Sequence, residues 1–143
     1  MGTCYNSTVV DSSIDKTWET IRDFHDMGWA APVIEQLDKV GGIAGDQAGA
    51  GRVLNGVFHE TLVSLDNPNH RFTYSIDDGP GPVAKDAVSN YLGVVELYPV
   101  TDSGQTLVVW ASSYESDSDE AVGDFCDPIY QALLATLKSH LSS

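Results

Sequence analysis

The residues that could bind a metal ion lack the spacing that a metal site needs. No pair of histidines forms a His-Glu-x-x-His motif on a helix. Residues 117–120, Asp-Ser-Asp-Glu, resemble the start of a calcium loop, but the third acidic ligand, the turn glycine and the closing glutamate do not follow. We therefore predict no metal and no cofactor, and interpret residues 117–120 as a capped helix start. The scattered histidines are His25, His59, His70 and His140.

The candidate nucleophiles also lack partners in the sequence. Cys4 and Cys126 lie far apart, and neither has a neighbouring histidine or a Cys-x-x-Cys spacing. No serine occupies a Gly-x-Ser-x-Gly elbow. These motifs therefore predict two free, reduced thiols and assign no catalytic residue.

The charge balance is strongly acidic, with 21 Asp and Glu against 7 Lys and Arg and a net charge of -14. Nucleic acids and anionic membrane surfaces require clustered cations, so neither is an expected partner. No apolar run is long enough to span a bilayer, and the N-terminus lacks the pattern of a signal peptide. We therefore predict a cytoplasmic protein without membrane insertion.

The element that must position any site is the C-terminal stretch, residues 117–141. Its apolar residues recur at steps of three or four, so one face of a single helix carries them. Either this long helix kinks near Asp124, or Asp127 caps a shorter helix that begins at Pro128. We favour the kinked long helix because the apolar stripe continues through the proline. The stripe comprises Val122, Phe125, Ile129, Leu133, Leu137 and Leu141, with Cys126, Tyr130 and Leu134 beside it.

The chain before this helix has mainly the patterns of strands. A strand over residues 4–10 precedes a helix over residues 14–24 and a short helix or tight loop over residues 27–32. Short turns between the later strands indicate an antiparallel meander, and the helix stripe would lie across it as an α+β fold. Residues 1–143 are predicted to form one domain. The further strands are expected at residues 33–40, 52–54, 57–65, 71–77, 88–100 and 105–115.

Alternation of side chains predicts which residues face the helix. On residues 71–77, Phe72, Tyr74 and Ile76 point inward. On residues 91–98, an outward Glu96 places Tyr91, Gly93, Val95 and Leu97 inside. On residues 106–114 both faces carry apolar residues, so the alternation does not choose between them.

Several short stretches resemble a known superfamily in their types and order. They are Ser13-Ile14-Asp15-Lys16-Thr17-Trp18, Gly49-Ala50-Gly51-Arg52, Glu60-Thr61-Leu62-Val63-Ser64-Leu65-Asp66, Phe72-Thr73-Tyr74-Ser75-Ile76, Asn90-Tyr91-Leu92-Gly93 and Gly104-Gln105-Thr106-Leu107-Val108-Val109-Trp110. Over essentially its whole length the chain resembles the START/Bet v 1-like (SRPBCC) superfamily, in its polyketide cyclase/dehydrase and lipid-transport branch. The resemblance implies a helix-grip fold: a seven-stranded, curved antiparallel sheet wrapped around the long C-terminal helix, with two short helices after the first strand.

The same resemblance implies a cavity between sheet and helix. Similarity to the plant abscisic-acid receptors would line it with Glu35, Glu60, Leu62, Tyr74, Tyr91, Trp110, Ser112, Phe125, Ile129 and Leu133. This set mixes aromatic rings, hydroxyls and carboxylates, which suits a largely apolar pocket with a few placed polar groups. We expect it to bind a small, mostly hydrophobic molecule that is neutral or cationic, as a carrier or sensor of lipid-like or polyketide-like compounds. The mouth would lie at residues 55–57 and 78–86.

Two other functions remain open. One is a polyketide aromatase/cyclase or dehydratase in the same cavity, with Glu60 and Tyr91 as its candidate acid and base, or Glu35 with Glu60 as a carboxylate pair. The other is an interaction module that uses an acidic outer face, with a homodimer as one possible form.

Overall fold

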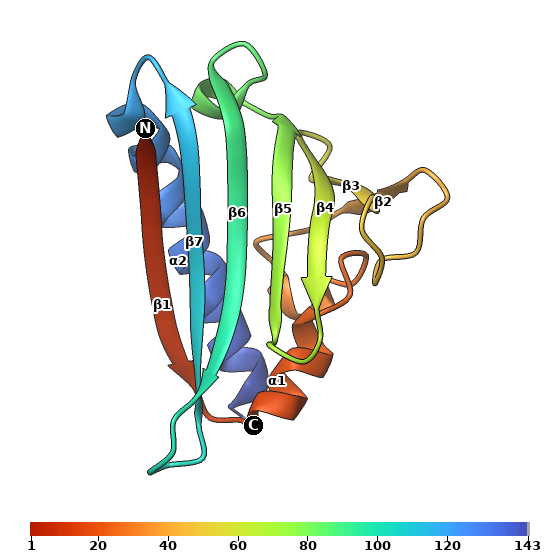
Figure 1. Cartoon of the computed structure of the whole chain (residues 1–143), viewed down its shortest axis with the longest axis vertical. Helices are drawn as coiled ribbons and strands as arrows, with labels where there is room; N and C mark the ends of the chain where they lie inside the picture. The colour runs from red at the N-terminus through yellow and green to blue at the C-terminus, as the bar shows by residue number, and fades with distance from the viewer. Residues whose placement is uncertain (143) are drawn as a thin grey trace.

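The computed structural model describes residues 1–142 and shows one seven-stranded antiparallel sheet with a long helix across it (Figure 1). The strand order is β1-β7-β6-β5-β4-β3-β2, so β1 joins β7 and the other strands follow as a meander. The elements are β1 (Gly2–Val10), α1 (Ile14–Ile21), the 3-10 turn η1 (Gly28–Ala30), β2 (Leu37–Val40), β3 (Gly51–Leu54), β4 (Phe58–Asp66), β5 (Arg71–Asp78), the 3-10 turn η2 (Gly81–Val83), β6 (Val88–Pro99), β7 (Thr106–Ser116) and α2 (Asp119–Leu141). The predicted α+β helix-grip architecture is confirmed.

Helix α2 is continuous from Asp119 to Leu141 and contains Pro128 in its interior. The long helix is therefore confirmed, and the shorter helix capped by Asp127 is wrong. The Ser118 side chain accepts a hydrogen bond from the Ala121 N–H at 3.4 Å, and acidic residues in the first turn suit the helix dipole. The buried residues Val122, Cys126, Tyr130, Leu133, Leu134, Leu137 and Leu141 face the sheet and the core.

The sheet register places a row of inward residues beneath α2. Tyr74 on β5 pairs with Gly93 on β6, Gly93 pairs with Ser112 on β7, and Ser112 pairs with Cys4 on β1. The inward set expected for β6 is buried. A Cβ atom at Gly93 would overlap the Tyr74 ring, so glycine at this position lets the ring lie flat on the sheet.

Most predicted boundaries agree with the structure to within two residues, and two are wrong by more. The first helix ends at Ile21 rather than at residue 24, and the strand expected over residues 33–40 begins only at Leu37. The reason in the second case is a loop held by Asn55. Its side-chain oxygen accepts from the backbone N–H groups of Glu35 (2.8 Å) and Gln36 (3.1 Å), and its amide donates to the Val33 carbonyl (3.0 Å). These bonds replace the ladder that an extended strand would use.

Asn55 and Gly56 form the tight turn between β3 and β4, and both have positive φ angles, 52° and 70°. Positive φ at both central residues is the conformation of a hairpin turn that asparagine followed by glycine adopts readily. The turn fixes the register of β3 against β4, which matters for the site below. Within residues 1–142, none of the helices is both long and apolar enough to cross a lipid bilayer.

Candidate functional site

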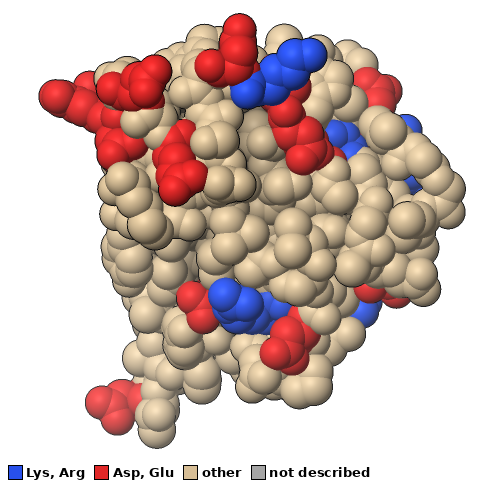
Figure 2. All heavy atoms as spheres, turned by 45° about the horizontal axis from the view of Figure 1, so that its top comes forward, with Lys and Arg blue, Asp and Glu red and all other residues tan. Residues whose placement is uncertain are grey.

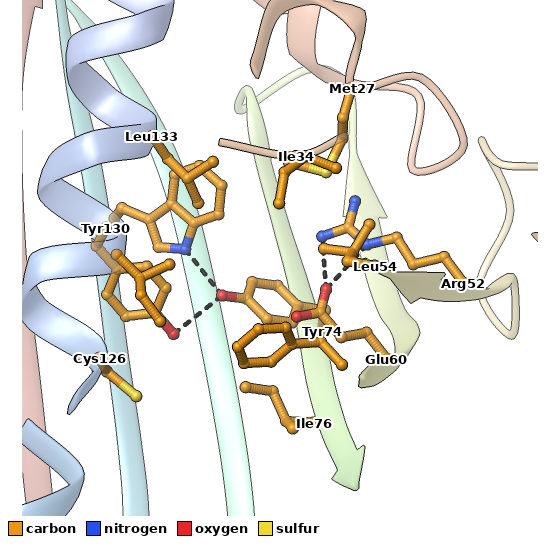
Figure 3. A pocket seen from close by; sticks show the side chains of 13 residues that line it. Met27, Ile34, Arg52, Leu54, Glu60, Tyr74, Ile76, Cys126, Tyr130 and Leu133 are labelled. Atoms are coloured by element: carbon orange, nitrogen blue, oxygen red, sulfur yellow. Dashed lines mark hydrogen bonds and ion pairs between the residues drawn. The ribbon is translucent and has the colours of Figure 1, made fainter. Parts of the chain in front are cut away.

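A small cavity lies between α2 and side chains of strands β3, β4, β5 and β7 (Figure 3). Its volume is about 30 Å³, which is room for one or two water molecules. Most of its wall is apolar or aromatic, with a buried ion pair on one side and hydroxyl groups on the other. The lining residues are Met27, Ile34, Arg52, Leu54, Phe58, Glu60, Tyr74, Ile76, Trp110, Cys126, Ile129, Tyr130 and Leu133.

The ion pair joins Arg52 and Glu60, which stand directly opposite each other on β3 and β4. Arg52 donates from Nε (2.9 Å) and Nη2 (2.6 Å) to the same oxygen, Oε1 of Glu60. The two side chains are only 3% and 7% exposed. The guanidinium also lies 3.7 Å above the Phe24 ring and donates from Nη1 to the Phe24 carbonyl at 3.1 Å. The positive charge is therefore held firmly against both an aromatic face and a carboxylate.

The second oxygen of Glu60, Oε2, is left without such a partner. Within residues 1–142, the hydrogen bonds to this carboxylate come from Arg52 and reach Oε1. Figure 3 shows the other oxygen directed toward Tyr74 and the lined space. Burial raises the pKa of the Glu60 carboxyl above its usual value, and the Arg52 guanidinium opposes that rise. The cavity thus contains a carboxylate oxygen that can accept a hydrogen bond.

A chain of hydrogen bonds crosses the opposite wall. Trp110 Nε1 donates to Tyr74 Oη at 2.8 Å, Tyr74 Oη donates to Tyr130 Oη at 3.2 Å, and Tyr91 Oη donates to Cys126 Sγ at 3.6 Å. Tyr91 and Tyr130 are also hydrogen-bonded to each other. Since an indole N–H can only donate and each phenol has one hydrogen, Tyr130 must donate to Tyr91. All three phenol hydrogens are therefore used within the chain.

Burial also determines the protonation of these groups. It raises the pKa of Tyr74, Tyr91 and Tyr130 well above that of a free phenol, and it raises the pKa of the Cys126 thiol to about 11. The phenols and the thiol are therefore neutral near pH 7. A phenol or thiol acts as a base or nucleophile after it has lost its proton, and the raised pKa values disfavour that loss near pH 7. None of these hydroxyl and thiol groups is therefore activated for catalysis.

The structure distributes the ten expected cavity residues over several environments. Five line the cavity: Glu60, Tyr74, Trp110, Ile129 and Leu133. Leu62, Tyr91 and Ser112 are buried in the core but do not line it, and Phe125 is half-buried and packs against Phe58 with ring centroids 6.3 Å apart. Glu35 is exposed in the loop before β2.

The placement of Glu35 separates the two carboxylates that were considered as an acid–base pair. Glu60 is in the cavity wall, whereas Glu35 lies on the surface because Asn55 holds its backbone in the loop. Tyr91, the other candidate partner of Glu60, lies behind the wall and is bonded to Tyr130 and Cys126. Neither candidate therefore meets Glu60 inside the cavity.

Three functional groups of the wall were not among the expected site residues. Arg52 was the most informative of them, because a cation eight residues before Glu60 faces it across an Asn-Gly hairpin. The pairing of Arg52 with Glu60 could have been predicted by counting residues outward from the Asn55–Gly56 turn along the two strands. Tyr130 and Cys126 lie beside the apolar stripe of α2, but their contacts depend on how the helix is rotated against the sheet.

The fold and the cavity define a helix-grip protein, and comparisons with known proteins agree. Residues 1–142 match the family described as "Polyketide cyclase / dehydrase and lipid transport", and the chain belongs to this family. The predicted START/Bet v 1-like membership is therefore confirmed. A search of curated proteins finds no match.

Solved structures show the same fold. A protein from Nitrosospira multiformis is 40% identical, with a TM-score of 0.95 over 99% of this chain and 97% of that chain. The protein XoxI from Bacillus cereus is 25% identical, with a TM-score of 0.82 over 99% and 96% of the two chains. A protein from Bacillus thuringiensis is 24% identical, with a TM-score of 0.80 over 98% of each chain, and shows likeness of fold alone.

Proposed function

We propose that this protein binds a small, mostly hydrophobic molecule between the sheet and α2, as a carrier or sensor of lipid-like or polyketide-like compounds. The observation that carries the proposal is the presence of a charged pair in an otherwise apolar cavity wall. Arg52 and Glu60 are buried at 3% and 7% exposure, where solid packing would favour apolar residues of similar volume. Ligand cavities commonly combine an apolar wall with a few polar groups that orient the ligand, and the charged pair fits that role.

The present cavity of about 30 Å³ is too small for such a ligand, so binding requires side chains to move. Four lining residues are only half-buried, and the wall is closest to solvent there: Ile34, Phe58, Ile76 and Ile129. Phe58 begins β4 directly after the hairpin turn and packs on Phe125 of α2. Displacing this ring pair would join the cavity to the surface near the β3–β4 hairpin.

Native mass spectrometry of freshly purified protein tests the proposal by detecting a retained small molecule. Ile129→Phe, which fills the cavity, should reduce the retained mass or the affinity for it at least tenfold. Ala135→Phe adds the same ring at an exposed position of α2 and should leave binding unchanged. Equal retention by both variants would contradict the proposal, and so would a wild type that binds none of a set of lipid-like and polyketide-like compounds.

The second candidate is catalysis in the same cavity, as a cyclase or dehydratase. The observation that favours it is the Glu60 carboxyl, whose raised pKa suits proton transfer and which lines the cavity. If the protein is an enzyme, Glu60→Gln should abolish turnover even at ligand concentrations that saturate the variant. Absence of turnover by the wild type with every ligand that it binds supports the carrier.

A further inference from the structure

The wall of the cavity has an uneven supply of hydrogen-bond donors and acceptors. On the aromatic side, the hydrogens of Trp110, Tyr74, Tyr130 and Tyr91 are all donated within the chain of bonds described above. A carboxylate or carbonyl group that entered the cavity would find no free hydroxyl hydrogen there. Against this side of the wall, its polar atoms would lose their hydration without a new hydrogen bond, which is a strong penalty in an apolar site.

On the other side, an acceptor oxygen faces the lined space beside the Arg52 guanidinium, three of whose five N–H groups are used by Glu60 Oε1 and the Phe24 carbonyl. Glu60 Oε2 is directed at the lined space, while Oε1 takes two hydrogen bonds from Arg52. Arg52 and Glu60 together are neutral, so a ligand carboxylate would add an uncompensated negative charge beside Oε2. A ligand O–H or N–H group would instead satisfy that oxygen.

Charge on the surface outside the cavity also disfavours an anionic ligand. The loop between β5 and β6 and the start of α2 lie at one end of the molecule, which Figure 2 brings forward with its acidic side chains. Asp86, Glu115 and Asp117 line one surface depression there together with a single cation, Lys85. Further exposed acids of this end are Asp77, Glu120 and Asp124. Anions approaching this end are repelled, and cations are attracted.

From these three observations we infer that the ligand has a hydrogen-bond-donating head, a hydroxyl or an ammonium group, and that this head binds Glu60 Oε2. The inference rests on the proposed binding function. It goes further because it names the chemical class of the head group and excludes fatty acids and other carboxylates. Arg52 acts as a positioning residue: it holds Oε1 and turns Oε2 toward the ligand.

Four probes with the same eight-carbon chain test the head group: octan-1-ol, octylammonium, octanoate and methyl octanoate. Their dissociation constants for the wild-type protein are measured by isothermal titration calorimetry at pH 7. We expect the alcohol and the ammonium ion to bind at least tenfold more tightly than octanoate and the ester. If octanoate or the ester binds as tightly as octan-1-ol, the inference is overturned although the binding function stands. If none of the four binds, both fail.

Glu60→Gln gives the second arm, because it leaves the Arg52 charge without its partner. In this variant octanoate should become the tightest of the four probes, and octylammonium should lose at least tenfold in affinity. Glu120→Gln makes the same chemical change at an exposed position on α2 and should keep the wild-type order. Should Glu60→Gln fail to fold, nuclear Overhauser contacts in the wild type between the C1 methylene of octan-1-ol and the Tyr74 ring decide the point. Contacts from the terminal methyl group in place of C1 would overturn the inference.

Discussion

Arg52 and Glu60 are opposite charges in a low-dielectric interior, where either one alone costs several kcal/mol. Their mutual attraction, two hydrogen bonds to Oε1 and the Phe24 ring offset that cost. The pair is therefore expected to contribute little net stability, although each charge depends on the other. A pair that adds little net stability is better explained by a role in ligand binding than by a role in folding.

We expect Arg52→Leu to lower the free energy of unfolding by about 3–5 kcal/mol, because it leaves the Glu60 carboxylate buried without a partner. The double variant Arg52→Leu with Glu60→Leu should recover most of that loss. Urea unfolding followed by circular dichroism measures both variants. A double variant as unstable as the sum of the two single variants would show that the charges do not depend on each other.

The pH dependence of stability follows from the raised pKa of Glu60. Because the folded state holds the Glu60 proton more tightly than the unfolded chain, ionisation of this group costs stability as pH rises above 4.5, the usual pKa of a glutamate side chain. Desolvation is the main cause, Arg52 opposes it, and Asp77 adds to it; Tyr74 is the other titratable group beside the carboxylate. With rising pH, the free energy of unfolding of the wild type should therefore fall relative to that of Glu60→Gln. Unfolding curves between pH 4 and pH 8 test the sign, and a shift in favour of the wild type would refute it.

At the scale of elements, the site depends on how β5, β6, β7 and α2 are placed relative to one another. Tyr74 reaches Trp110 and Tyr130 because its ring crosses Gly93 instead of standing upright from the sheet. A side chain on β6 would lift the ring and separate these hydroxyl groups. The glycine at position 93 of β6 thus controls the hydrogen bonds that Tyr74 makes with Trp110 and Tyr130.

Gly93→Ala should lower the free energy of unfolding by about 1–3 kcal/mol, because its Cβ atom overlaps the Tyr74 ring. Near-ultraviolet circular dichroism should change as well, since the surroundings of Tyr74 and Trp110 are altered. Ser89→Ala, at an exposed position of the same strand, is the control and should change neither. If Gly93→Ala behaves like the control, the ring does not lie over this position.

For the whole molecule, the dominant property is its net charge of -14. Repulsion among 21 acidic side chains favours expansion of the chain and is partly screened by salt. Within residues 1–142, the surface contacts between oppositely charged side chains are Arg71–Glu96, at 3.5 Å, and His70–Asp15, at 3.8 Å, which is an ion pair only when His70 is protonated. They offset little of the repulsion.

Raising NaCl from about 0.05 to 0.5 M should therefore raise Tm by a few degrees, because the Debye length falls from about 14 to about 4 Å. Differential scanning calorimetry measures the change. The variant Asp46→Lys with Asp102→Lys alters two exposed positions and brings the net charge from -14 to -10, since each change adds two units. Its response to salt should be smaller. An equal response would assign the effect to something other than net charge.

Much of the fold could be predicted from local patterns. The Asn55–Gly56 turn, the alternation on β6 and the apolar stripe of α2 each depend on a few neighbouring residues. On β5 the alternation was only partly right, because Thr73, expected outward, is buried. Boundaries were wrong where a distant side chain decides the backbone. The loop before β2 is an example, because Asn55 is about twenty residues away in sequence from the groups that it binds.

The amino-acid sequence by itself determined the antiparallel meander, the long helix and the set of β6 residues that face it. That Glu60 and Trp110 lie in the cavity wall followed only from the resemblance to the superfamily. Periodicity and turn chemistry are local, so they survive without knowledge of the tertiary contacts. Only the tertiary structure decided that Glu60 pairs with Arg52, that Glu35 remains at the surface and that the cavity has a volume of about 30 Å³. Those outcomes depend on side-chain packing between elements far apart in the chain, where one ångström separates an open pocket from a closed one.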